Sequence, residues 1–221
     1  MKLLIKYPTR GRKIKFLSTL QKYYNFLSKK NDVTFLITMD DDDSELNNDF
    51  VREVLDTYDN LIYFYGDSNT KIEAINNDLD KVGEWDILLL ASDDMIPSVK
   101  GYDEIIINEM KNNYPDTDGV LWFNDGYQGN KLNTLCVLGK KYYERFGYIY
   151  HPSYKSVWSD NEFMSVANIL NKQKYFEQTI IKHEHPDYGF GNRDFIHSDN
   201  QKNESSDKKI FEIRKSKNFD L

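Results

Sequence analysis

Short apolar runs alternate with helix-period segments along the first hundred residues. Continuous apolar runs, which are typical of strands buried on both faces, recur four times. Between them, apolar residues three or four positions apart predict amphipathic helices. Strands and helices in alternation predict right-handed βαβ units and an open α/β sheet. The expected strands cover residues 3–7, 32–40, 61–66 and 85–92, and the expected helices cover 14–30, 49–59 and 69–82.

The second half of the chain is less regular, and its expected elements are shorter. Helices and strands are mixed there, and the chain closes with a strand, a polar loop and a basic helix. No repeat or low-complexity segment divides the chain, so we expect one domain. The expected helices cover residues 101–113, 140–147, 159–170 and 207–219, and the expected strands cover 119–124, 134–139 and 174–186.

Composition excludes several classes of protein. Acidic residues outnumber basic ones by 36 to 29, for a net charge of −7, which argues against a protein that coats nucleic acid. Cys136 is the single cysteine, so we expect neither a disulfide framework nor a thiolate metal site, and a reducing compartment. No apolar run is long enough for a signal peptide or a transmembrane helix, which predicts a cytoplasmic protein.

Charged residues follow all the expected strands of the first half. The segments that follow them read PTRGR, MDDDDSE, GDSNTK and SDD. Because ligands bind at the carboxyl ends of the strands in open α/β sheets, these side chains are expected to share a site. Each segment taken singly also fits a solvated loop, and residues 40–43 fit an acidic turn.

Two adjacent carboxylates, Asp93 and Asp94, end the most apolar of these strands. A carboxylate pair at a strand end is costly unless cations lie beside it. Mg²⁺ and Mn²⁺ are hard cations that bind one or two carboxylates together with phosphate oxygens, which would explain the pair. Basic residues at positions 10, 12 and 13 would neutralise further phosphate charge. The alternative is a helix cap and turn, since Pro97 follows.

Four motifs follow one another along the chain: PTRGR after the first strand, an aspartate after the second, NTKIEAINNDL leading into WDILLLASDDMIP, and later WSDNEF. Together they resemble GT-A fold glycosyltransferases of the family 2 type. The resemblance covers roughly residues 1–190 and leaves the C-terminal helix outside it. It implies an open, mixed, mostly parallel α/β sheet flanked by helices.

The same resemblance implies a metal-dependent enzyme. It would transfer a hexosyl group from a nucleotide-diphosphate sugar, with a UDP-sugar favoured, to a hydroxyl of a glycan, glycoprotein or other acceptor. The chain would then divide into a donor half (1–100), an acceptor and catalytic half (101–190) and a C-terminal loop and basic helix (191–221).

The resemblance also implies a donor site at the strand ends. One acid after the second strand, Asp40, would meet the nucleobase or the ribose, and Lys71 would reach toward the nucleotide. The residues implied for donor binding are Pro8, Thr9, Arg10, Arg12, Asp40, Asn69, Lys71 and Asp93.

The family's Asp-x-Asp motif is incomplete in this chain. Its first aspartate falls on Ala91 and its second on Asp93, so metal binding would depend on Asp93, with Asp94 beside it. A late histidine often completes such a site, and we expect His185 to be that ligand for Mn²⁺ or Mg²⁺. Alternation on a strand places His183 on the same face, and both histidines also fit structural roles at a strand edge and a turn.

The resemblance places the catalytic base on Asp160, with Glu162 as the reserve candidate. A carboxylate there would remove the proton of the acceptor hydroxyl in an inverting transfer. The alternative is that Ser159 or Asp160 only caps the following helix, with Glu162 in its first turn.

The segment around residue 122 is expected to bind the acceptor. Trp122 and Trp158 offer rings that can stack on a sugar, and Asn124 and Asp125 offer hydrogen-bonding groups. For Trp122 the alternative is a place in a core strand. The basic tail helix either docks on the domain or is a solvated face.

Two other functions fit parts of this pattern. A sugar-nucleotide nucleotidyltransferase would share the strand order but needs a glycine-rich loop after the first strand, where this chain has only Gly11. A non-catalytic binder of nucleotides or sugars would tolerate Ala91 in the motif.

Overall fold

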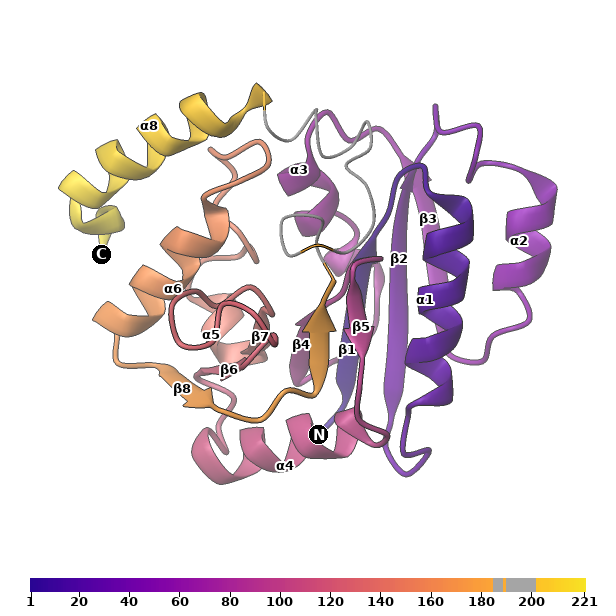
Figure 1. The fold of residues 1–221 in the computed structure, drawn as a ribbon, viewed down its shortest axis with the longest axis horizontal. Helices are drawn as coiled ribbons and strands as arrows, with labels where there is room; N and C mark the ends of the chain where they lie inside the picture. Colours follow the sequence, from indigo (N-terminus) through magenta and orange to yellow (C-terminus); the bar gives the residue numbers. More distant parts are fainter. Residues whose placement is uncertain (185–188, 190–201) are drawn as a thin grey trace.

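The computed structural model describes residues 1–184, 189 and 202–221, and its centre is a seven-stranded sheet (Figure 1). The strand order is β3-β2-β1-β4-β7-β6-β8. Strands β1 to β4 run parallel to one another, and β7 is antiparallel to both β4 and β6. The open, mixed, mostly parallel sheet expected from the sequence is confirmed. The strands are β1 (Leu3–Pro8), β2 (Val33–Asp40), β3 (Leu61–Gly66), β4 (Ile87–Leu90), β6 (Val120–Phe123), β7 (Val137–Gly139) and β8 (Gln173–Phe176).

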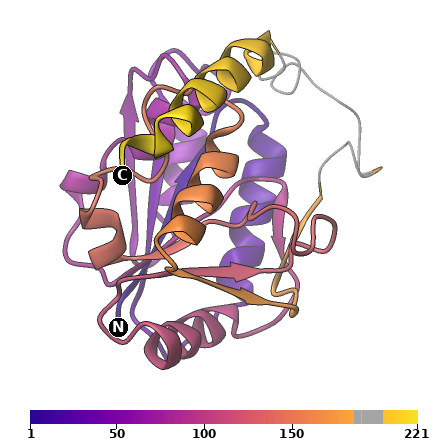
Figure 2. The same cartoon turned by 90° about the vertical axis from the view of Figure 1, so that its left-hand side faces the viewer.

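Helices cover both faces of this sheet, and each face has its own apolar core. Residues alternate along β1, so Leu3, Ile5 and Tyr7 pack toward α1, α2 and α4, while Leu4 packs with α3, α5, α6 and α8. Figure 2 shows α8 lying across α6 on the second face. The helices are α1 (Lys13–Asn25), α2 (Asp49–Leu55), α3 (Lys71–Asn76), α4 (Tyr102–Asn113), α5 (Lys140–Glu144), α6 (Ser159–Ile169) and α8 (Glu204–Ser216), with 3₁₀ turns η1 (Leu79–Lys81) and η3 (Asn218–Asp220).

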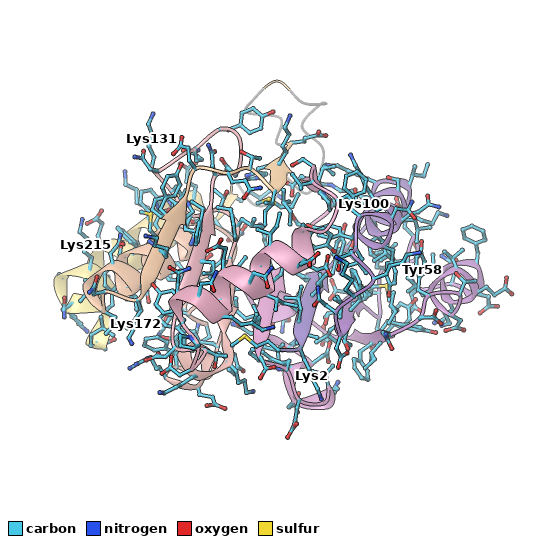
Figure 3. The ribbon with its side chains drawn as sticks, turned by 90° about the horizontal axis from the view of Figure 1, so that it is seen from below. Lys2, Tyr58, Lys100, Lys131, Lys172 and Lys215 are labelled. Carbon is cyan, nitrogen blue, oxygen red and sulfur yellow. The ribbon has the colours of Figure 1, made fainter. Side chains whose placement is uncertain are left out.

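The molecule is elongated along the direction in which the strands follow one another. Figure 3 shows Tyr58, which follows α2, and Lys215 of α8 at opposite ends. No helix among the described residues is both long and apolar enough to cross a membrane.

Two expected elements are each divided in the structure. The strand expected over 174–186 is two strands, β8 in the main sheet and β9 (Ile181–His183), which pairs antiparallel with β5 (Met95–Pro97). The helix expected over 69–82 breaks at Asp78, whose φ of 68° is left-handed, a conformation that aspartate tolerates better than most residues. In β5–β9, Met95 lies opposite His183, so this pairing brings the histidine close to the carboxylates that end β4.

The winding of the chain reverses beside β1. From β1 the chain adds β2 and β3 on one side, and it then returns to place β4 on the other side. In open α/β sheets this switch point, at the carboxyl ends of the strands, is where ligands bind. The loops that carry residues 9–12 and 91–94 both begin there.

A fully buried lysine, Lys6, lies on the α3 face of β1. Its ammonium donates to the hydroxyl of Thr38 and, at 2.7 Å, to the carbonyl of Asn77, while the Thr38 hydroxyl donates to Asp78 at 2.5 Å. Burial lowers the pKa of Lys6 to about 7, against the opposing charge of Asp78, and the charge of Lys81 lowers it further.

The Lys6 ammonium predicts a pH dependence of stability. The folded protein releases this proton near pH 7, whereas an unfolded lysine holds it up to about pH 10.5. Between these values the unfolded state binds more protons, so the free energy of unfolding rises with pH, by at most ~1.4 kcal/mol per pH unit. Urea unfolding at several pH values should show this rise in the wild type and a smaller rise in Lys6→Met. Parallel curves for the two proteins would contradict the assignment.

Candidate functional site

The loops after β1 and β2 are held together by an arginine fork. Arg10 donates to Asp40 at 2.7 Å and to both oxygens of Asp42 at 2.6 and 2.9 Å. The N–H of Gly11 donates to Asp43 at 2.6 Å, and Gly11 and Arg12 take left-handed φ values of 59° and 50°. The loop between β1 and α1 therefore folds back over the acidic end of β2.

Asp40 ends β2 with one carboxylate oxygen unused. The residue is 7% exposed; Oδ2 accepts from Arg10, and Oδ1 is buried with no hydrogen-bond partner among the described residues. A buried acceptor without a donor costs free energy, so a ligand N–H or O–H that reached it would bind favourably. Pro8 and Thr9, implied for the same pocket, are half-buried at the adjacent end of β1.

Asp93 follows β4 and faces two basic side chains of the first loop and helix. Its Oδ1 lies 3.0 Å from the guanidinium of Arg12 and 3.7 Å from the ammonium of Lys15, and its carbonyl accepts from the hydroxyl of Thr19 at 3.1 Å. Burial raises the pKa of Asp93, an effect that Arg12 and Lys15 oppose and the neighbouring Asp94 increases. Ala91, in the position of the first motif acid, is 1% exposed and belongs to the core.

Asp94 points to a different partner, His183 of β9. Its Oδ1 accepts from the Ser92 hydroxyl, and its Oδ2 lies 3.7 Å from Nε2 of His183. The opposite nitrogen of the imidazole lies 3.6 Å from Asp125.

The two carboxylates keep His183 charged. Burial alone would lower the pKa of His183, but Asp125 and Asp94 raise it to about 9. Burial alone would raise the pKa values of Asp94 and Asp125, but the contact with His183 lowers both. The pKa of Asp94 is held well below its usual range, and that of Asp125 falls to about 2. An imidazolium between two carboxylates therefore joins β9 to the β4–β5 turn and to the loop after β6.

Asp160 lies in the first turn of α6. It is half-buried, and its carboxylate accepts from the N–H of Asn161 at 2.9 Å. Burial raises the pKa of Asp160, while the positive charges of Lys71 and His183 lower it. The charge of Lys71, at the start of α3, also lowers the pKa of Asp94.

The reserve candidate, Glu162, is held in a structural network. It is 4% exposed, accepts from the Tyr154 hydroxyl at 2.6 Å, and pairs with Nε of Arg214 at 2.8 Å. These partners occupy both of its oxygens and tie α6 to α8, so Asp160 is better placed than Glu162 to meet a substrate.

The four residues expected to bind an acceptor lie in different environments. Trp122 is 6% exposed and packs edge-on against Tyr175, and Trp158 is half-buried against Phe211. Asn124 accepts from the N–H of Gly126 at 2.8 Å. Asp125 accepts from two backbone N–H groups and the Thr134 hydroxyl, besides facing His183, so its role here is to order its loop.

Asn69, expected to bind the donor, belongs to the cap of α3. Its N–H and side-chain amide both donate to Glu73, at 2.7 and 3.2 Å, while Thr70 accepts from the N–H of Glu73 at 3.1 Å. This arrangement resembles a capping box, except that Glu73 accepts from Asn69, the residue before the N-cap Thr70, and it fixes the backbone at Lys71.

A divalent cation fits beside Asp93 but not beside Asp94. Among the described residues no group of three or more His, Cys, Asp and Glu side chains is placed to hold a metal. Both ion pairs of Asp93 fall on Oδ1, which leaves Oδ2 for a cation, whereas Asp94 is committed to Ser92 and His183. One carboxylate suffices for Mg²⁺ or Mn²⁺ when phosphate oxygens and water complete the shell. His185 lies outside the described residues.

The sequence pattern missed three features of this region. Lys15 pairs with Asp93, His183 joins Asp94 to Asp125, and α8 packs against α6 through Arg214. A helical projection of α1 and of α8 would have indicated the inward faces that carry Lys15 and Arg214, because residues four and seven positions apart on a helix share a face. The contact of His183 with Asp94 and Asp125 has no local signal, because these three residues come from three distant segments.

No protein-family model matches the chain, and no curated protein matches it. Solved structures do match, and they include mannosyltransferase PcManGT from Pyrobaculum calidifontis in complex with GDP-Man and Mn²⁺, with a TM-score of 0.62, 12% identity, and coverage of 80% of this chain and 55% of that one. Residues 1–349 of S. aureus TarS in complex with UDP-GlcNAc match with a TM-score of 0.64, 12% identity, and coverage of 90% and 61%. A 4-diphosphocytidyl-2C-methyl-D-erythritol synthase from Anaerococcus prevotii matches with a TM-score of 0.54, 15% identity, and coverage of 82% and 89%.

These matches show the fold. The chain has the GT-A fold that its motifs imply, and it spans somewhat more than half the length of the first two proteins.

Proposed function

We propose that this chain is a glycosyltransferase that moves a sugar from a nucleotide-diphosphate sugar, with a UDP-sugar favoured, to a hydroxyl of a glycan, glycoprotein or other acceptor. The proposal includes a donor half over residues 1–100 and an acceptor half over 101–190 within one domain, and a cytoplasmic location. The observation that carries it is the convergence of Arg12, Lys15 and Asp93 at the switch point of a GT-A fold, where the charge of Lys71 also lowers the pKa of Asp160.

Donor binding follows from the charges at the strand ends. Arg10, Arg12, Lys15 and Lys71 surround the carboxyl ends of β1 and β4, and a diphosphate is the ligand that such a group of cations attracts. The unused Oδ1 of Asp40 supplies a buried acceptor for a nucleobase N–H or a ribose hydroxyl.

Sugar transfer assigns the base role to Asp160. Its carboxylate takes the proton of the acceptor hydroxyl while that oxygen attacks the anomeric carbon from the face opposite the diphosphate. The bond between the anomeric carbon and the diphosphate oxygen breaks, and the nucleoside diphosphate leaves with the bonding electrons. Burial raises the pKa of Asp160, which makes it a stronger base than an exposed aspartate, and the charge of Lys71 opposes that rise.

A Mn²⁺ or Mg²⁺ ion would be held by Oδ2 of Asp93. When bound, it would neutralise negative charge on the leaving diphosphate. Arg12 and Lys15 hold the Asp93 carboxylate in place whether or not the ion is present, because their contacts use Oδ1. His185 remains a proposed additional ligand.

Calorimetric titration of UDP, GDP, dTDP and CDP, each with and without Mn²⁺, tests the donor site without knowledge of the acceptor. One diphosphate is expected to bind tightly with Mn²⁺ and about tenfold or more weakly without it, because the ion contributes charge-assisted contacts. Asp93→Ala should remove this metal dependence, while Glu45→Ala, an exposed acid after β2, should keep it. Binding of no diphosphate would overturn the proposed function, and binding that ignores Mn²⁺ would overturn its metal dependence.

A non-catalytic binder of the same ligands is the second candidate. The observation that favours it is Ala91, which is buried in the core where the family motif places an acid. A binder and an enzyme share the donor contacts and differ at Asp160, which only an enzyme needs as a base.

A further inference from the structure

The C-terminal helix α8 binds the loop that precedes Asp160. Asp207 of α8 is fully buried, and its carboxylate accepts three consecutive backbone N–H groups, those of Lys155 at 3.1 Å, Ser156 at 2.9 Å and Val157 at 3.0 Å. A charged acceptor with three donors makes stronger bonds than neutral groups do, so this contact orders the loop immediately before α6.

The next residue, Trp158, has a strained backbone. Its φ of 65° lies in the left-handed region, which for a bulky residue is unfavourable by about 1–3 kcal/mol and persists only when surrounding contacts hold it. Those contacts come from α8, because the Trp158 ring packs on Phe211 with ring centroids 5.2 Å apart and the Lys208 ammonium lies 5.5 Å from its centre. The strained turn sends the chain into α6 and places Asp160 in its first turn.

A second contact of α8 holds α6 itself. The Nε of Arg214 lies 3.0 and 2.8 Å from the two oxygens of Glu162, and its remaining nitrogens reach Asp220 and the carbonyl of Phe219. Glu162 is two residues beyond Asp160 in the same turn. The helix that carries Asp160 is therefore anchored on both sides of that residue by α8.

The loop at residues 155–157 also contacts α3, the helix that begins with Lys71. The carbonyl of Lys155 accepts from the N–H of Ile72 at 3.3 Å, so the same loop joins α8 to the first turn of α3. A shift of this loop would therefore change the position of Asp160 relative to Lys71, whose charge lowers the pKa of Asp160.

We propose that Asp207 and Arg214 are positioning residues for sugar transfer, and that α8 holds Asp160 in the geometry that accepts the acceptor's proton. The inference rests on the proposed function. Neither residue touches substrate, and both act through Asp160. An error of about 1 Å in the placement of a reacting group can lower a rate by about 100-fold, so loosening the loop is expected to reduce turnover without weakening donor binding.

The test compares Asp207→Asn, Arg214→Lys and the control Glu212→Gln, an exposed acid on the same helix. The binding probe is whichever of UDP, GDP, dTDP and CDP the wild type binds most tightly. The turnover probe is a sugar derivative of that diphosphate, chosen among glucose, galactose, mannose and N-acetylglucosamine as the one that the wild type hydrolyses fastest. Asp207→Asn should lower kcat for diphosphate release by about 100-fold and leave the Kd of the diphosphate unchanged. Glu212→Gln should match the wild type in both.

The double variant Asp160→Asn/Asp207→Asn separates positioning from general support of the fold. If Asp207 acts through Asp160, the double variant should be no slower than Asp160→Asn alone, because effects of residues that act as a unit do not add. Additive losses, or an Asp207→Asn variant as fast as the wild type, would overturn the inference.

If Asp207→Asn fails to fold, Arg214→Lys provides the test, since it keeps the positive charge and loses the guanidinium fork that contacts both oxygens of Glu162, Asp220 and the carbonyl of Phe219. It should fold and lose about tenfold or more in kcat at unchanged Kd. Wild-type turnover in this variant would overturn the inference. A wild type that binds no diphosphate, or hydrolyses none of the four sugars, would overturn the proposed function itself.

Discussion

Asp160→Asn is expected to lower the rate of sugar transfer by about 1,000-fold, with the affinity for the nucleoside diphosphate unchanged. The amide has the size of the carboxylate, and its oxygen can still accept the N–H of Asn161, so this contact in the first turn of α6 is kept. What the amide lacks is the capacity to accept a proton, which is the role proposed for Asp160. The measurement is the initial rate of diphosphate release together with calorimetric titration of the same diphosphate.

Glu144→Gln, an exposed acid-to-amide change at the end of α5, is the matched control and should behave as the wild type. Unchanged turnover in Asp160→Asn would leave the non-catalytic binder as the function. Loss of both turnover and diphosphate binding would mean that Asp160 serves only to hold the fold.

The fold of the first hundred residues was predictable, because strands and helices that alternate along a chain form an open α/β sheet. The run at residues 87–90 is apolar at every position, which suits a strand covered on both faces, and it lies in the middle of the sheet between β1 and β7. The charged loops that follow the first four strands converge because parallel strands end at one edge. The pairing of Arg10 with Asp40 and of Arg12 with Asp93 follows from that convergence.

The parts that the sequence did not reveal depend on contacts between distant segments. Strands β5 and β9 have three residues each, too few for a periodic pattern, and exist because they pair with each other. The break at Asp78 depends on its tertiary surroundings, where its carboxylate accepts from Thr38.

The C-terminal helix shows the same limit in another form. Its basic residues suggested a solvated face, and Lys209 and Lys215 are indeed exposed. The informative residue is the acid among them, since Asp207, Phe211 and Arg214 follow at helical spacing on the face that packs toward α6. The many basic residues of such a helix describe its exposed face. Its packed face is indicated by the apolar and acidic residues that lie among them at helical spacing.

Lys71→Met is expected to weaken binding of the nucleoside diphosphate by about tenfold or more, because a charge-assisted contact contributes ~1.5–3 kcal/mol. Lys71 is exposed and its side chain makes no hydrogen bond or ion pair within the described part of the chain, so its ammonium is available to a ligand. The substitution keeps the length of the side chain and removes its charge. Calorimetric titration of the diphosphate measures this effect.

Lys71→Met should also shift the pH dependence of turnover, with the acid limb moving to higher pH. Lys71 lowers the pKa of Asp160, so removing its charge raises that pKa, and the base becomes protonated at a higher pH. The acid limb of the kcat/KM profile should therefore move to higher pH in Lys71→Met. Lys100→Met, an exposed lysine on the surface shown in Figure 3, should leave both the affinity and the acid limb unchanged. An acid limb that stays in place while affinity falls would mean that Lys71 serves the donor alone and that another charge sets the protonation of Asp160.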